Sequence, residues 1–240
     1  MIAWVSVAAS LQGKRERNED AVCIERVGAR NASSVVMIGC DGVGSLPGSG
    51  ETAAAVMEAA LRAIRGYLRR RYGLGPFRPG EHMLLACCLR RLKLARGLQG
   101  ASTLAAAVVP GRLKARRILT FAVGDTRIYF LDDRKGLIQV TTDDHDGQGS
   151  LTAFVTAAGR VVYRSLRRHT KLHRLRETPR AIAITTDGIH EQCRPAELEA
   201  FLRYCIKGGV RSPEGLGDLL ATFLRHNISD NASLCLHYRT

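Results

Sequence analysis

The sequence arranges its strand-like and helix-like segments in blocks, and this order constrains the fold more than any other feature. Strand patterns come first and two helical patterns follow; a second group of strands comes next, and two helices and a last strand end the sequence. Such grouping favours an α+β arrangement over a parallel sheet, in which helices and strands would alternate one by one. We therefore expect an α+β sandwich.

The individual segments are predicted from the spacing of apolar residues. A helix is expected from about Glu51 to Arg71, because its apolar residues recur on one helical face. A second helix is expected around Leu85, and two more begin near Pro195 and Pro213, since proline suits the first turn of a helix. Residues 151–180 are rich in Arg and His and show no readable period, so no element is predicted there. Strands are expected at residues 2–9, 21–27, 35–40, 101–109, 116–123, 127–132, 137–141, 181–186 and 232–238.

The composition fits one folded domain over residues 1–240 with a strong excess of positive charge. Hydrophobic residues make up 45% of the sequence, which is enough to bury a core. The sequence has 36 Lys and Arg against 22 Asp and Glu, a net charge of +14 that attracts anionic partners. Many basic residues fall on the predicted solvent face of the first long helix, and aromatic residues are few. A solvated surface is therefore favoured over a nucleic-acid site.

The seven cysteines and the apolar segments bear on the cell compartment. The number of cysteines is odd, no Cys-x-x-Cys pair is present, and most cysteines lie in apolar runs. A disulfide framework or a zinc site is therefore not expected, which fits a reducing, cytoplasmic location. The apolar start MIAWVSVAAS is interpreted as a first strand, and no apolar run has the length of a membrane span.

Aspartates at the ends of short apolar runs are the candidate functional residues. Asp41 and Asp187 each follow such a run and precede a glycine, and Asp125 follows a glycine at the end of another. Asp230 precedes the last predicted strand. Carboxylates at one sheet edge suit hard cations such as Mg²⁺ and Mn²⁺, whereas a single such Asp is usually only a turn residue. The joint pattern of Asp41, Asp187 and Asp230 therefore predicts a metal site.

Two metal ions and a nearby arginine would suit the hydrolysis of a phosphate ester. A pair of metals about 3.5–4 Å apart can activate a bridging water and stabilise the leaving oxygen. Arg15 stands in a polar turn beside Glu19 and Asp20, where its guanidinium could hold a phosphate through paired hydrogen bonds.

Seven motifs in this order resemble those of the type 2C metal-dependent Ser/Thr protein phosphatases, in particular the bacterial and archaeal single-domain members. Each motif is weak alone, but together they span about residues 4–238. They are GKRERNED, VMIGCDGVG with the later GET, GASTLAAAVV, FAVGDTRIYFL, TTDDH, AITTDGIHE and ISDNASL.

The resemblance implies a four-layer α-β-β-α sandwich, with two central antiparallel sheets flanked by helix pairs and two metals in a cleft. In the family pattern Asp41 bridges the metals and Arg15 binds the substrate phosphate. The other residues matching the metal site are Glu19, Asp20, Gly42 through its carbonyl, Asp187 and Asp230. Asp125 and Glu191 match positions of a possible third metal. His145 matches a structural position, and His190 is expected at the surface.

The implied activity is dephosphorylation of phosphoserine and phosphothreonine by a hydroxide that bridges two Mn²⁺ or Mg²⁺ ions. Phosphorylated substrates of a Ser/Thr kinase are the expected partners, and the protein is expected to act as a monomer without nucleic acid or membrane. Animal members carry a histidine at the position of Val43. Bacterial members usually have an apolar residue there, as this sequence does. The segment between TTDDH and LTAFVTAAG is very short where relatives carry a flap, which should widen the cleft and alter specificity.

Three other functions remain open from the sequence. The first is a non-catalytic relative that binds phosphoproteins or has a regulatory role. The second is a hydrolase of small phosphate esters, which the short flap segment would suit. The third is nucleic-acid binding driven by the positive charge, which a steep salt dependence would reveal.

Overall fold

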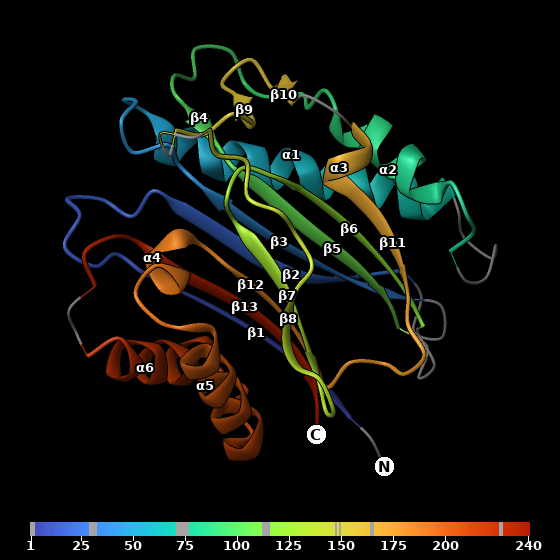
Figure 1. Cartoon of the computed structure of the whole chain (residues 1–240). Coiled ribbons are helices and arrows are strands. Elements are labelled where there is room, and N and C mark those ends of the chain that lie inside the picture. Colours follow the sequence, from blue (N-terminus) through green and yellow to red (C-terminus); the bar gives the residue numbers. More distant parts are fainter. Residues whose placement is uncertain are drawn as a thin grey trace.

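Two antiparallel five-stranded sheets form the centre of the protein (Figure 1). The computed structural model describes residues 3–28, 33–70, 77–111, 116–146, 148, 150–163, 166–225 and 228–240. Sheet A has the order β1 (Trp4–Leu11), β13 (Ala232–Arg239), β12 (Ala181–Thr185), β7 (Arg127–Asp132) and β8 (Gly136–Gln139). Sheet B has the order β11 (Thr170–Arg174), β6 (Arg117–Val123), β5 (Leu104–Pro110), β3 (Ser34–Asp41) and β2 (Asp20–Val27).

A pair of helices covers the outer face of each sheet. The helices α1 (Ser49–Arg70) and α2 (Glu81–Leu89) pack on sheet B, whereas α5 (Pro195–Gly208) and α6 (Pro213–Phe223) pack on sheet A (Figure 1). Alternate residues of β3 separate the layers: Val36 and Ile38 face the helices, while Val35 and Met37 face the other sheet. Three hydrophobic clusters thus fill the three interfaces of a four-layer sandwich, which confirms the expected fold class.

A third, small sheet lies above the helix layer of sheet B. This sheet C has the order β10 (Val161–Val162), β9 (Phe154–Thr156) and β4 (Ala101–Ser102). Two short helices, α3 (Leu166–His169) and α4 (Asp187–His190), complete the described elements. Residues 151–180, for which the sequence allowed no assignment, contain β9, β10, α3 and β11. Elements of two to five residues are too short to carry a periodic signal.

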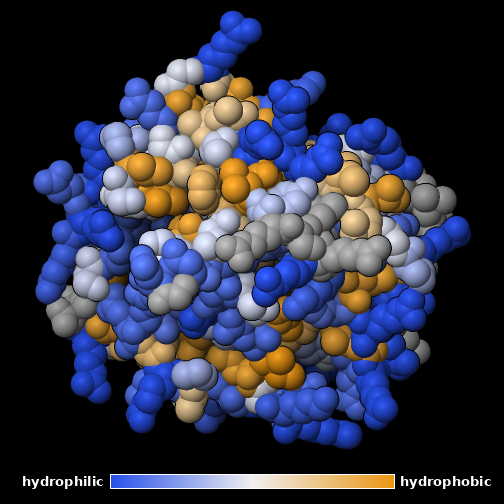
Figure 2. Space-filling model, turned by 45° about the horizontal axis from the view of Figure 1, so that its top comes forward, coloured by the Kyte–Doolittle hydropathy of each residue, from blue (hydrophilic) through white to orange (hydrophobic). Residues whose placement is uncertain are grey.

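The longer elements follow the predicted segments closely. The expected long helix is α1, and the helices expected near Pro195 and Pro213 begin at those residues. Every predicted strand coincides with an observed strand to within a few residues. The predicted segments also include residues 2 and 71, which lie outside the described residues. The face in Figure 2 is mainly hydrophilic with smaller hydrophobic patches, and no helix in the described ranges has the length and apolar character to cross a bilayer.

Gly39 lies where the two sheets meet, and its substitution tests this packing. A Cβ atom at Gly39 would lie 2.7 Å from Cγ2 of Ile184 in the facing sheet. We expect Gly39→Val to lower the free energy of unfolding by about 1–3 kcal/mol, because the close-packed interface cannot accept the added atoms. Gly66→Ala is the matched control, since its Cβ would meet only Arg70 at 3.7 Å and it lies within α1. This control should stabilise the protein by up to about 1 kcal/mol in urea unfolding. A neutral effect of Gly39→Val would contradict the described packing.

Candidate active site

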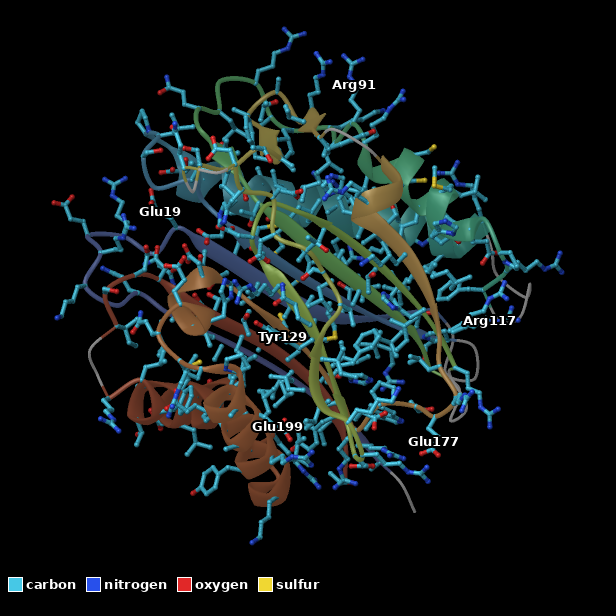
Figure 3. All side chains as sticks on the ribbon, in the orientation of Figure 1. Glu19, Arg91, Arg117, Tyr129, Glu177 and Glu199 are labelled. Carbon is cyan, nitrogen blue, oxygen red and sulfur yellow. The ribbon has the colours of Figure 1, made fainter. Side chains whose placement is uncertain are left out.

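A pocket of about 380 Å³ at one end of the sheets gathers most of the predicted site residues. Seven of them line it: Arg15, Glu19, Asp41, Gly42, Asp125, Asp187 and Asp230. Asp20 lies behind the pocket wall, opposite Asp41 in the pairing of β2 with β3. Glu191 is exposed and is not among the residues that line the pocket. Glu19 marks this end of the sheets in Figure 3.

The pocket collects its acidic residues from both sheets. Asp41 is the last residue of β3 in sheet B. In sheet A, Asp187 follows β12 as the first residue of α4, and Asp230 precedes β13. Asp125 lies in the turn that connects β6 of sheet B to β7 of sheet A. Side chains that are far apart in the sequence therefore meet at one edge.

Backbone contacts fix the position of Asp41. Its N–H donates to Oγ1 of Thr103 at 2.9 Å, and the Thr103 N–H donates to the Asp41 carbonyl at 2.8 Å. The hydroxyls of Thr103 and Thr126 are 2.6 Å apart. Gly42 must be glycine, because a Cβ there would lie 2.8 Å from the backbone of Ser49. Thr103 was missed from the sequence, although a polar residue at the start of the apolar run 104–109 is a signal for such a role.

Asn231 positions the loop that carries Arg15 and Glu19. Its Oδ1 accepts a hydrogen bond from the Glu19 N–H at 2.8 Å, and its Nδ2 donates to the carbonyls of Gln12 and Arg17 at 2.6 and 3.0 Å. The Asn231 N–H in turn donates to Oδ1 of Asp230 at 2.7 Å. Asn231 therefore does more than cap a turn, and sequence reasoning did not identify this role.

The buried carboxyl groups repel one another. Burial, together with the charges of Asp20 and Asp187, raises the pKa of Asp41 well above its usual range. Burial and the charge of Asp187 raise the pKa of Asp20 to about 7, although a hydroxyl of Thr186 donates to its Oδ2 at 2.8 Å. Burial and the charge of Asp125 raise the pKa of Asp187 to about 6. A cation among these groups would remove this cost.

The carboxylate groups of the pocket are of the type that binds a hard divalent cation, but in the described residues they do not surround a single point. No group of three or more His, Cys, Asp or Glu side chains in the described ranges is arranged to hold a metal ion. Asp230 forms an ion pair with Arg15. The buried Oδ1 of Asp20 has no hydrogen-bond partner, and the pocket offers carboxylate oxygens. These are the ligands that Mg²⁺ and Mn²⁺ prefer.

Asp125 is oriented by the residues of the TTDDH motif. Nε2 of His145 lies 3.0 Å from Oδ2 of Asp125, within hydrogen-bonding distance. Oδ2 of Asp144 accepts the Gly124 N–H at 3.0 Å and so holds the turn before Asp125. Gly124 has a φ of +94°, which glycine adopts without strain. His145 thus helps to position Asp125, which agrees with a structural role.

The prediction that His190 lies at the surface was wrong. His190 is buried, and its Nδ1 lies 3.1 Å from Oγ1 of Thr185. Burial and the charge of Arg127 lower the pKa of its imidazole to about 3, so the ring is neutral. The cause is the short helix α4, which turns His190 back onto the end of β12. A helix of four residues was not predicted from the sequence.

The short segment after TTDDH forms a tight connection. His145 and Leu151 pair across it, and the Thr152 N–H donates to the carbonyl of Asp144 at 2.7 Å. Leu151 lines the pocket. The expected effect of this short segment on the width of the cleft stays a prediction, and residues 147 and 149 of the connection lie outside the described ones.

The fold is similar to those of bacterial Ser/Thr phosphatases. A bacterial serine phosphatase has a TM-score of 0.65 at 18% identity, with 99% of this chain and 96% of that chain covered. Stp1 from Staphylococcus aureus has a TM-score of 0.63 at 18% identity over 99% of this chain and 94% of that one. The catalytic domain of PstP, solved with two manganese ions, has a TM-score of 0.65 at 18% identity over all of both chains.

The sequence matches a family model but no individual curated protein. A search of curated proteins finds no significant match. The family model described as protein phosphatase 2C matches residues 9–225, which is most of the sequence. This match supports a phosphatase and agrees with the fold. The chain therefore belongs to the protein phosphatase 2C family.

Proposed function

We propose that the protein is a metal-dependent phosphatase of phosphoserine and phosphothreonine in proteins, with one catalytic domain over residues 1–240. The observation that carries this proposal is the convergence of Arg15, Asp41, Asp187 and Asp230 on one pocket. The neighbour PstP contains two manganese ions. Two Mn²⁺ or Mg²⁺ ions would use Asp41, Asp187, Asp230, Glu19 and the Gly42 carbonyl, with Asp20 behind them. Asp125 and Glu191 are the residues for a possible third ion.

Arg15 is the residue that would bind the substrate phosphate. Its guanidinium lines the pocket close to Gly44. A Cβ atom added to Gly44 would lie only 3.0 Å from Nη1 of Arg15, so the glycine leaves room for the guanidinium. Hydrogen bonding to Asp230, and the charges of Glu19 and Asp187, raise its pKa above the usual value, so it stays positive. A guanidinium can hold two phosphate oxygens at once and orient the phosphorus.

The remaining groups determine how the reaction would proceed. Bound metals would supply an activated water as the nucleophile and neutralise charge on the phosphate. Asp41 would fix the geometry, because its backbone is held by Thr103. Val43 has no proton to give, so the leaving alcohol would take its proton from water. All seven cysteines are free thiols and none lines the pocket, which supports a mechanism without a cysteine nucleophile.

A small-ester hydrolase is the second candidate function. The tight connection between His145 and Leu151 replaces a long flap, so less of the chain is available to contact a peptide on that side. The described acidic site would serve either substrate class. We expect the protein to act in the cytoplasm as a monomer, on substrates of a Ser/Thr kinase.

The test is metal-dependent release of phosphate from a phosphothreonine peptide. Protein stripped with a chelator should be inactive, and added Mn²⁺ or Mg²⁺ should restore turnover on the order of 1–10 s⁻¹. Excess chelator should abolish the activity again, because the nucleophile depends on the metals. Peptide hydrolysis in the stripped protein would contradict the proposal. Activity on p-nitrophenyl phosphate but not on the peptide would favour the small-ester function, and metal binding without either activity would favour a non-catalytic relative.

A further inference from the structure

The excess positive charge is confined to two stretches of the sequence. Residues 82–124 contain eight Lys and Arg, and residues 147–176 contain seven, and neither stretch contains an Asp or Glu. The remaining sequence has 21 Lys and Arg against 22 Asp and Glu, so its charge is close to balanced. The charge of +14 is therefore unevenly distributed along the sequence.

The two basic stretches meet beside sheet C. The Leu92 N–H donates to the carbonyl of Gly159 at 2.7 Å, and the Val161 N–H donates to the carbonyl of Arg90 at 3.2 Å. The backbone segments around Arg91 and Arg160 are paired in an antiparallel bridge. A pocket of about 720 Å³ lies at this junction, nearly twice the volume of the candidate active site. We call it the arginine groove; its lining includes Arg90, Arg91, Thr156, Arg160, Val162 and Tyr163.

Among the described residues, no acidic side chain neutralises the guanidinium groups of the groove. Arg90, Arg91 and Arg160 are exposed, the lining contains no acidic residue, and no carboxylate in the described ranges forms an ion pair with them. Elsewhere arginines are often paired, as Arg127 is with Asp143 at 2.6 Å and Arg239 with Asp133 at 2.7 Å.

Apolar surface lies between these charges. Val162 is exposed, and the ring of Tyr163 is half-buried in the lining. Figure 2 turns this side forward and shows hydrophobic patches among projecting hydrophilic side chains. Arginine and tyrosine are enriched at protein interfaces, because both combine apolar contact with hydrogen bonding.

Sheet C connects the groove to the candidate active site. At one edge, β4 is bridged through Ser102 to Gly42, and the Val43 N–H donates to the carbonyl of Ala101 at 2.9 Å. At the other edge, β10 contributes Val162 to the groove. In Figure 3, Arg91 lies at the top of the protein, and Glu19 marks the active-site end. Three strand spacings, from Gly42 through β4 and β9 to β10, amount to roughly 14 Å, which an extended peptide covers in about four residues.

We infer that the arginine groove binds an acidic segment of the phosphoprotein substrate while its phosphorylated residue occupies the active site. This inference rests on the proposed phosphatase function and adds a substrate class: phosphoproteins with Asp, Glu or further phosphates several residues from the target. A peptide fits the observations better than nucleic acid, because Tyr163 is the one aromatic residue among the described residues that line the groove.

The test separates binding from turnover. Two fluorescent phosphothreonine peptides are compared by anisotropy in the presence of chelator, one with about four glutamates starting about four residues from the phosphothreonine and one with glutamines instead. The acidic peptide should bind roughly tenfold more tightly at low salt, and the preference should fall as salt is added. Arg91→Glu/Arg160→Glu should remove the preference. Lys207→Glu/Arg211→Glu is the control, since it changes the charge equally at exposed residues of the α5–α6 region.

Turnover with Mn²⁺ then tests the link to the substrate. The acidic peptide should have a KM roughly tenfold below that of the glutamine peptide, and only the Arg91/Arg160 variant should lose this difference. Equal binding of both peptides by the wild type, or equal loss of preference in the control variant, would overturn the inference. So would tighter binding of a single-stranded oligonucleotide that requires Arg91 and Arg160. A preference in binding without any turnover would preserve the groove but contradict the proposed phosphatase function.

Discussion

Replacing Asp41 with asparagine should abolish phosphatase activity and at the same time stabilise the metal-free protein. Asparagine keeps the shape of the side chain but cannot supply a charged oxygen to bridge two metals, so kcat should fall at least about 10³-fold. In the metal-free state the same change removes a buried carboxyl group whose pKa is raised by burial, Asp20 and Asp187. The free energy of unfolding at pH 8 should therefore rise by about 1–3 kcal/mol.

Two measurements check this pair of effects. Turnover of a phosphothreonine peptide is compared with urea unfolding in chelator and in Mn²⁺, because metal binding should stabilise the wild type but not the variant. Asp218→Asn is the matched control: Asp218 is exposed in α6, and this change should alter neither quantity. Activity within tenfold of the wild type, or a variant less stable than the wild type in chelator, would refute the role given to Asp41.

The stability of the metal-free protein should be nearly level at mildly acidic pH and should fall as the pH rises above about 6. Burial lowers the pKa of His173 and His237 to about 4 and that of His190 to about 3. Below pH 6.5 these imidazoles bind protons only in the unfolded chain, so on their own they would lower the stability as the pH falls. Asp187, with a pKa of about 6, Asp20, with a pKa of about 7, and Asp41, with a pKa raised further, act in the opposite sense, because above about pH 4 they keep protons only in the folded state. Above pH 6.5 the unfolded imidazoles lose their protons as well, so the effect of the carboxyl groups prevails.

The alkaline side of this profile reports on the site itself. Between pH 6.5 and pH 8 the chelated protein should lose about 2 kcal/mol, since one pKa unit corresponds to about 1.4 kcal/mol. Saturating Mn²⁺ should abolish this loss, because deprotonated carboxylates bind the metal better as the pH rises. Urea midpoints at pH 6.5, 7, 7.5 and 8 measure it. Asp41→Asn should flatten the chelator profile, whereas Asp218→Asn should not. A chelated wild type that gains stability over this window would show that the carboxyl groups are not coupled as described.

The sequence predicted the larger part of the fold, for a physical reason. Long segments such as α1, and strands that are buried on both faces such as β3, repeat their apolar residues over enough positions to be recognised. The strands of the small sheet C and the helix α4 contain only two to four residues each, so their own sequences carry no periodic signal. Their effects, such as the burial of His190, were missed for the same reason.

The sequence pointed to the charged residues of the candidate site, but not to the neutral residues Thr103 and Asn231 that position them. Asp41 and Asp187 are conspicuous because a charge at the end of an apolar run needs an explanation. Thr103 and Asn231 are ordinary polar residues in sequence, and their importance lies in hydrogen bonds to segments over 60 and over 200 residues away. The arginine groove was likewise invisible, since it depends on where Arg91 and Arg160 are brought together.

The two sheets contribute different residues to the candidate site, so the site lies between two halves of the protein. Sheet B carries Asp41, and sheet A carries the segments with Asp187 and Asp230. The interface between the two sheets is apolar. Ions bound to carboxylates of both sheets would therefore hold the two sheets in register.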